Sequence, residues 1–177
     1  NVQTDPDKAA THFEACRAWQ GRLHEAGLMG IAWPAEYGGA GGASWMSRIE
    51  REIARDYEEW TGFVGASTAM IGPALLRHGN ETQKRAFLPK LRGAELTFCQ
   101  LFSEPGAGSD LASLATRGDR DGDEYIVNGQ KVWNSAAQHA DWAFLLVRTD
   151  ADAPKHRGIT FLLVDMTSPG IEVRPLV

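Results

Sequence analysis

The spacing of apolar residues changes near Leu96, and this change constrains the fold more than any other feature. Upstream, apolar residues recur at intervals of three and four, which places them on one face of a helix. One such set is Phe13, Cys16, Trp19, Leu23 and Ala26. Downstream, short apolar runs are separated by polar turns that contain Gly or Pro. Helices followed by strands predict two domains, a helical domain over residues 1–95 and a β-domain over residues 96–177.

Local signals mark where further helices begin and end. Ser44 is expected to be the N-cap of a second helix, whose apolar residues again recur at intervals of three and four. These residues are Met46, Ile49, Ile53, Tyr57 and Trp60. Asn80 with Gln83 resembles a capping box, which predicts the start of a later helix that Gly93 ends.

Two dipeptides predict β-hairpins in the second half of the chain. Asp121-Gly122 and Asn128-Gly129 are strong hairpin turns, and residues 124–127 form the expected strand between them. Further strands are expected over residues 143–148, 159–164 and 171–173.

Composition excludes several classes of protein. Net charge is −5 with no basic stripe among 177 residues, so we expect no nucleic-acid partner. No apolar run is long enough for a membrane span, and no signal peptide is visible. Cys16 and Cys99 form neither a C-x-x-C pair nor a disulfide framework. Two buried thiols in a reducing compartment are the expectation, which favours a cytoplasmic protein.

The stretch from Phe102 to Asp110, FSEPGAGSD, combines hydroxyls, acids and glycines in one loop. Pro105 stiffens the loop, while Gly106 and Gly108 permit backbone conformations that other residues avoid. Such a loop can turn several backbone N–H groups toward one anionic group, as phosphate-binding nests do. Taken alone, the residues favour a surface turn that is followed by a core tryptophan, Trp133.

Other common site motifs are missing. The glycine-rich residues 30–42 have no Gly-Lys-Ser/Thr ending and no preceding strand, which excludes a P-loop. Asp119, Asp121 and Asp123 mimic the start of an EF-hand loop, but Glu124 stands where that loop needs Gly. The five histidines lack metal-binding spacing, and no G-x-S-x-G elbow occurs. We therefore expect no metal site and no α/β-hydrolase.

Several longer motifs, each present once, follow one another along nearly the whole chain. They are GIAWPAEYGGAG (Gly30 to Gly41), HGNETQKRAFLPKLRG (His78 to Gly93), SEPGAGSD, DGDEYIVNGQKVW, ADWAFLLVRTD and KHRGITFLLVDMTSPGIEVRPL (Lys155 to Leu176). Together these motifs resemble the acyl-CoA dehydrogenase family. The resemblance implies an α+β fold, with an N-terminal helical bundle followed by an antiparallel β-barrel that is incomplete in this sequence.

The resemblance also implies FAD as the cofactor. In the family, ten positions ending at the Ser of the SEPGAGSD loop contact FAD, as does a later triplet that is usually Trp-Ile-Thr. Gln100 stands where an aromatic is common, and Asn134-Ser135 replaces Ile-Thr. Ser109 is expected to bind the FAD pyrophosphate and also to touch the acyl-CoA, while Trp133 lies against the flavin ring. The implied cofactor residues are Gln100, Leu101, Phe102, Ser103, Gly108, Ser109, Trp133, Asn134 and Ser135.

The reaction implied is α,β-dehydrogenation of an acyl-CoA to a trans-2-enoyl-CoA, with electrons passed to an electron-transfer flavoprotein. The family's carboxylate base is a Glu in a later helical region, so no catalytic residue is assigned here, and Glu104 is expected to hold its loop. The sequence is expected to be an inactive fragment of a homo- or hetero-oligomeric enzyme, a dimer or tetramer, in lipid metabolism. An acyl-CoA oxidase or flavin monooxygenase of the same fold, or a non-catalytic subunit of a heteromeric dehydrogenase, remain as alternatives.

Overall fold

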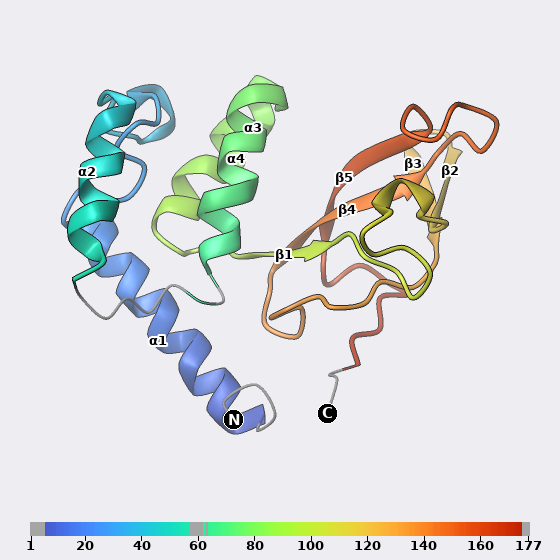
Figure 1. The fold of residues 1–177 in the computed structure, drawn as a ribbon, viewed down its shortest axis with the longest axis horizontal. Helices are drawn as coiled ribbons and strands as arrows, with labels where there is room; N and C mark the ends of the chain where they lie inside the picture. The colour runs from blue at the N-terminus through green and yellow to red at the C-terminus, as the bar shows by residue number, and fades with distance from the viewer. Residues whose placement is uncertain (1–5, 57–61, 63, 175–177) are drawn as a thin grey trace. The chain divides into compact units, whose positions relative to one another are not determined.

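The computed structural model describes residues 6–56, 62 and 64–174, and Figure 1 shows its fold. Tertiary contacts divide the chain into two units, one ending at Phe98 and one spanning Cys99–Val173. The first unit is helical, and the second contains most of the β-sheet. Tyr57 and Trp60, which we expected on a helix, lie outside the described residues.

Helix α1 packs through the face that the apolar spacing predicts. Phe13 and Cys16 of α1 are buried. Gln20 on the same helix is also buried, and its Nε2 donates to the carbonyl oxygen of Leu91 on α4 at 2.6 Å. The helical elements are α1 (Pro6–Glu25), η1 (Ala35–Tyr37), α2 (Ser44–Ala54), the π-helical η2 (Ser67–Ile71), α3 (Gly72–His78), α4 (Glu81–Arg92) and, in the second unit, the 3-10 helix η3 (Leu111–Ser113). No described helix is apolar over enough of its length to cross a bilayer.

The predicted capping box at the start of α4 is confirmed. The backbone N–H of Gln83 donates to Asn80 Oδ1 at 2.8 Å, and the N–H of Asn80 donates to Gln83 Oε1 at 3.0 Å. Gly93 is the C-cap, as predicted. The helix accommodates Pro89 in its interior, and Leu88 and Leu91 beside it are fully buried.

Helix α2 differs from the prediction at its first residue. Ala43 is its N-cap and Ser44 is the first helical residue, with no side-chain cap. The expectation for Ser44 was therefore wrong by one position, a common uncertainty at helix ends. The apolar residues Met46, Ile49 and Ile53 do share the helix, but all three are exposed.

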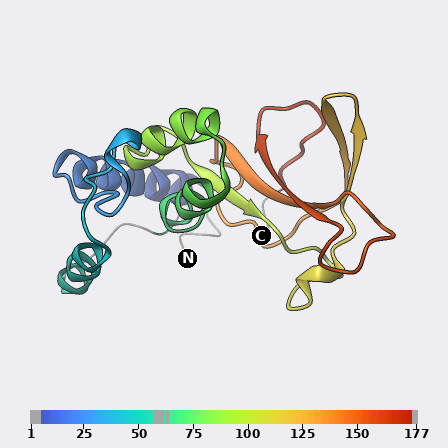
Figure 2. The same ribbon diagram turned by 90° about the horizontal axis from the view of Figure 1, so that it is seen from above.

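The second unit is built on an open, mixed sheet of five strands. Strands β4 and β5 form its longest antiparallel pair, from Trp142 opposite Asp165 to Arg148 opposite Ile159. The contact between β2 and β4 is parallel, at Arg117 opposite Arg148, so the sheet is not purely antiparallel as expected. In other respects the expected α+β class is confirmed, since helices precede strands of a sheet that does not close (Figure 2). The strands are β1 (Phe98–Leu101), β2 (Arg117–Asp121), β3 (Glu124–Asn128), β4 (Trp142–Arg148) and β5 (Ile159–Asp165).

One of the two predicted hairpins forms. Strands β2 and β3 pair with Asp121 opposite Glu124, and Gly122 enters the turn with a φ of 61°. The expected turn at Asn128-Gly129 is wrong, because no strand follows β3 directly. A Cβ on Gly129 would collide with Thr116, so this glycine permits a close approach of two segments instead.

An aromatic cluster involves both β4 and β5, through Phe144 and Phe161. The ring of Phe144 meets that of Phe102 edge-on at 5.4 Å and stacks on Phe161 at 6.0 Å between centroids. Val147 is fully buried on the same strand as Phe144. Residues 171–173 form no strand, contrary to the sequence prediction.

Candidate functional site

The loop that follows β1 closes on itself as a tight turn. The backbone N–H of Glu104 donates to the carbonyl oxygen of Ala107 at 2.9 Å, and the reverse bond measures 3.0 Å. Pro105 and Gly106 occupy the two central positions, and proline suits the first of them because its φ is fixed. The sequence therefore makes the start of this loop rigid.

The glycines of the loop do not adopt the unusual backbone conformations that the sequence led us to expect. Neither Gly106 nor Gly108 has a φ in the left-handed region, and a Cβ on either would meet no atom within 4 Å. Within the described residues, the backbone N–H groups of Gly108 and Ser109 donate to no protein acceptor, and the Ser109 hydroxyl makes no hydrogen bond. Both residues are exposed. These donors are therefore available to an anionic group.

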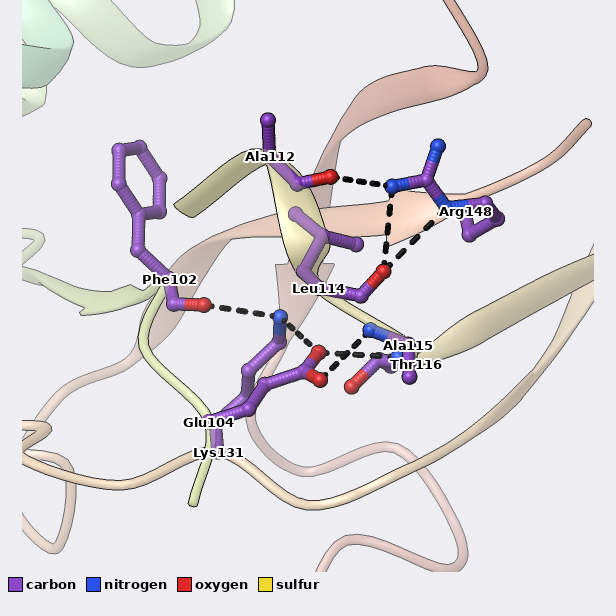
Figure 3. Close-up of polar contacts among 8 residues, drawn as sticks. All are labelled: Phe102, Glu104, Ala112, Leu114, Ala115, Thr116, Lys131 and Arg148. Atoms are coloured by element: carbon purple, nitrogen blue, oxygen red, sulfur yellow. Dashed lines mark hydrogen bonds and ion pairs between the residues drawn. The ribbon is translucent and has the colours of Figure 1, made fainter. Parts of the chain in front are cut away.

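Glu104 is the centre of a buried polar cluster (Figure 3). Its carboxylate forms an ion pair with Lys131 Nζ at 2.8 Å, and the two side chains are only 8% and 6% exposed. It also accepts from the backbone N–H groups of Ala115 at 2.7 Å and Thr116 at 2.9 Å. Burial alone would raise the pKa of Glu104, but the bonds from Lys131, Thr116 and Ala115 outweigh it and lower the pKa to about 2.

Lys131 joins two segments that are distant in sequence. Besides Glu104, its ammonium donates to the carbonyl oxygen of Phe102 at 3.0 Å. Next to it, the N–H of Val132 donates to the carbonyl oxygen of Ser103 at 2.9 Å. Burial lowers the pKa of Lys131, and the ion pair with Glu104 opposes this effect. Residues 102–104 and 131–132 are thus bound together by side-chain and backbone hydrogen bonds.

Trp133 follows this junction in an unusual conformation. Its φ is 62°, a left-handed value that bulky residues rarely adopt. Its side chain is 79% exposed, the largest exposure among the large apolar residues that the structure describes. Strained backbone of this kind is concentrated at ligand-binding sites. An exposed indole on a strained backbone makes Trp133 a candidate binding residue.

The two residues after Trp133 also present polar groups. Asn134 Oδ1 is buried and has no hydrogen-bond partner among the residues that the structure describes. Such an orphaned acceptor is costly unless a ligand or water satisfies it. Ser135 is exposed, and Ala136 again has a positive φ of 62°.

Arg148 holds the segment that lies between the loop and β2. Its Nη2 donates to the carbonyl oxygens of Ala112 at 2.6 Å and Leu114 at 3.2 Å (Figure 3). Its Nη1 donates to the carbonyl oxygen of Lys155 at 2.9 Å. Glu104 and Arg148 therefore restrain the same segment, one through its N–H groups and the other through its carbonyl groups.

The structure separates the predicted site residues into two kinds. Leu101 and Phe102 are partly buried, since Leu101 packs against an apolar cluster and the ring of Phe102 contacts that of Phe144. Gln100 is partly buried on β1. The polar or exposed members are Ser103, Gly108, Ser109, Trp133, Asn134 and Ser135.

The sequence predicted that some of these residues lie close together, but it did not reveal all the residues that position the site. Ser103 does lie beside the segment that carries Trp133, through the bond from Val132. Among the described residues, Ser109 makes no hydrogen bond to that segment. The roles of Lys131 and Arg148 were missed, since a single cation in a strand or turn carries no distinctive spacing. Burial of their head groups is a property of the fold.

Both parts of the chain match domains of one family. Residues 2–95 match the acyl-CoA dehydrogenase N-terminal domain, and residues 99–177 match the acyl-CoA dehydrogenase middle domain. Acyl-CoA dehydrogenase IpdE1 of Mycobacterium tuberculosis is 43% identical over 175 residues, which cover 97% of this chain and 45% of that protein. Acyl-CoA dehydrogenase FadE34 of the same bacterium is 48% identical over 154 residues, covering 87% and 21%. The chain thus spans less than half the length of these relatives.

Solved structures of the family resemble the chain as well. The Tcur3481-Tcur3483 steroid ACAD has a TM-score of 0.75 at 38% identity, with 87% of this chain and 40% of that chain covered. The ChsE4-ChsE5 complex of Mycobacterium tuberculosis has a TM-score of 0.74 at 39% identity, covering 87% and 40%. A glutaryl-CoA dehydrogenase of Mycobacterium smegmatis in complex with FADH2 has a TM-score of 0.69 at 28% identity, covering 90% and 41%. The domain matches and the identities agree, and the chain belongs to the acyl-CoA dehydrogenase family.

Proposed function

We propose that the protein to which this chain belongs is an FAD-dependent acyl-CoA dehydrogenase that oxidises an acyl-CoA thioester to a trans-2-enoyl-CoA. The observation that carries the proposal is Trp133, an exposed indole on a strained backbone, tied to a loop with unpaired N–H donors. A flat aromatic face suits contact with a flavin ring. Unpaired backbone donors suit a pyrophosphate. The FADH2 complex of a related dehydrogenase supports the same cofactor.

Different residues would hold different parts of FAD. The backbone N–H groups of Gly108 and Ser109 and the Ser109 hydroxyl would hold the pyrophosphate, with Ser109 also touching the acyl-CoA. The hydroxyls of Ser103 and Ser135 would donate to the polar edge of the flavin, and Trp133 would lie against the ring. Asn134 Oδ1 would accept from a polar group of the cofactor or a bridging water, and residues 100–102 would contribute backbone. FAD, when bound, supplies the hydride acceptor.

The base that removes the α-proton is proposed to lie outside this sequence. Glu104 cannot serve, since its carboxylate already accepts from Lys131, Ala115 and Thr116. With a pKa of about 2 it is also too weak a base for this step at neutral pH. Its role is to hold the loop.

The wider assignments follow the family. We propose domains over residues 1–95 and 96–177, an electron-transfer flavoprotein as the electron acceptor, and a cytoplasmic enzyme. We propose a dimer or tetramer, and the similarity to the ChsE4-ChsE5 complex makes a hetero-oligomer a specific possibility to test. The similarity to a steroid ACAD adds thioesters of steroid side chains to the candidate substrates.

The test uses the purified parent protein. We expect bound FAD, bleaching of the flavin absorbance by an acyl-CoA under anaerobic conditions, and turnover with an electron-transfer flavoprotein. The substrate panel should contain straight-chain, branched and steroid-derived acyl-CoAs. Rapid oxygen uptake with hydrogen peroxide release would identify an oxidase instead, and FAD binding without bleaching would indicate a non-catalytic subunit. A parent protein that binds no flavin would overturn the proposal.

A further inference from the structure

We propose that the ion pair between Glu104 and Lys131 is a positioning element that sets the spacing between the two segments that hold FAD. The inference rests on the proposed function, since it concerns how the cofactor is held. It adds two residues that touch neither cofactor nor substrate and act through their neighbours.

The pair lies where the two segments meet. Glu104 immediately follows Ser103, and Lys131 stands two positions before Trp133. Lys131 binds the Glu104 carboxylate at 2.8 Å and the Phe102 carbonyl oxygen at 3.0 Å, so it contacts both a side chain and the backbone of the loop (Figure 3). A shift of Lys131 would therefore move Trp133 relative to Ser103.

The carboxylate extends the same restraint to a third segment. It accepts from the N–H groups of Ala115 and Thr116, which lead into β2. The backbone of Glu104 also closes the turn with Ala107. Glu104 thus joins three parts of the site: its backbone closes the turn, and its side chain binds the entrance to β2 and the segment that contains Lys131.

The strain at Trp133 is consistent with this role. A left-handed φ in a bulky residue persists only where its surroundings over-determine it. On one side the restraints are Lys131 and Val132, through their bonds to Phe102, Ser103 and Glu104. On the other side the N–H of Ala137 donates to the carbonyl oxygen of Asn134 at 3.1 Å. Loss of the ion pair removes the strongest restraint on the first side.

The burial of the pair allows positioning to be separated from stability. Removing one partner leaves an uncompensated buried charge and destabilises the fold, whatever the role of the pair. Replacing both partners by neutral side chains of similar size removes this penalty. Glu104→Gln with Lys131→Met keeps one acceptor oxygen, whereas the carboxylate offers one to Ala115 and another to Thr116, and it loses the bond from Lys131 to Phe102. A purely structural role predicts that stability and FAD binding both recover in this double variant.

The experiment compares the full-length parent protein with the double variant Glu104→Gln/Lys131→Met. The thermal midpoint, the FAD dissociation constant of the apoprotein and the visible circular dichroism of the bound flavin are measured. We expect a midpoint near that of the wild type, an FAD dissociation constant raised about tenfold or more, and an altered flavin dichroism. Arg117→Gln, which breaks the exposed pair of Arg117 and Asp119, is the matched control and should change none of these.

The outcomes separate the two proposals. A wild-type parent that binds no FAD overturns the proposed function and this inference together. A double variant with wild-type affinity and wild-type dichroism overturns only the positioning role. If the double variant does not fold, Lys131→Arg takes its place, since it keeps the charge but changes the geometry at Phe102. For that variant, weaker FAD binding with altered dichroism supports the inference, and unchanged values overturn it.

Discussion

Two donors of Arg148, Nε and Nη2, both point at the carbonyl oxygen of Leu114, each at 3.2 Å. The same guanidinium reaches the carbonyl oxygens of Ala112 and Lys155. A rigid fork of donors is well suited to such an arrangement, and a lysine cannot reproduce it. Arg148 therefore organises the backbone between the loop and β2.

The first prediction concerns this arginine. Arg148→Met should lower the free energy of unfolding by about 2 kcal/mol, because partly buried carbonyl groups lose their donors. Arg148→Lys should recover only part of this loss. Chemical denaturation of the purified protein measures the effect, with Arg157→Met at an exposed position as the control. Equal stability of the Arg148 and Arg157 variants would contradict the role assigned to Arg148.

Acid should remove the contribution of Glu104 to the free energy of unfolding over a defined range of pH. Its pKa lies at about 2 in the folded protein, against an ordinary value of 4.5, so the unfolded chain binds more protons between these values. The contribution is complete above pH 4.5 and is lost as the pH falls toward 2. The difference in pKa corresponds to about 3 kcal/mol. Glu104→Gln should flatten the dependence of unfolding free energy on pH in this range, and an unchanged slope would argue against the buried pair.

The strain at Trp133 can be tested by two small replacements. Trp133→Ala and Trp133→Gly both remove the indole, but only glycine adopts a φ of 62° without a steric cost. The Gly variant should therefore be more stable than the Ala variant by about 1 kcal/mol. Both should alter the flavin absorbance of the parent protein to the same extent. An Ala variant as stable as the Gly variant would show that the backbone is not strained there.

Local signals were predictable from sequence, and distant contacts were not. The capping box of Asn80 and Gln83 depends on residues within one turn of helix, so the sequence alone reveals it. Asn128-Gly129 carried an equally local hairpin signal, but the close approach of Gly129 to Thr116 is a tertiary contact and overrides it. The loop of residues 102–110 was recognisable from its own composition. The partner of its acid, Lys131, is visible only after folding.

The chain as given should have no dehydrogenase activity on any acyl-CoA. It covers 45% of the length of IpdE1, and its best-placed acid, Glu104, is held in an ion pair. Purified residues 1–177 should therefore show no turnover with an artificial electron acceptor, even with added FAD. The parent protein, assayed in parallel, is the positive control. Slow but saturable turnover by the fragment would place a catalytic base within this sequence.

The last prediction concerns Ser109 in the parent protein. If its hydroxyl donates to the FAD pyrophosphate, Ser109→Ala removes one charge-assisted hydrogen bond, worth about 1.5–3 kcal/mol. The FAD dissociation constant should then rise by about ten- to a hundredfold. The backbone N–H groups of Gly108 and Ser109 remain, so binding should weaken rather than vanish. Ser113→Ala, on the short helix that follows the loop, is the matched control, because its hydroxyl already donates to Asp110. Titration of the apoprotein at one ionic strength measures both variants, and equal constants for Ser109→Ala and the wild type would show that the loop is only a surface turn.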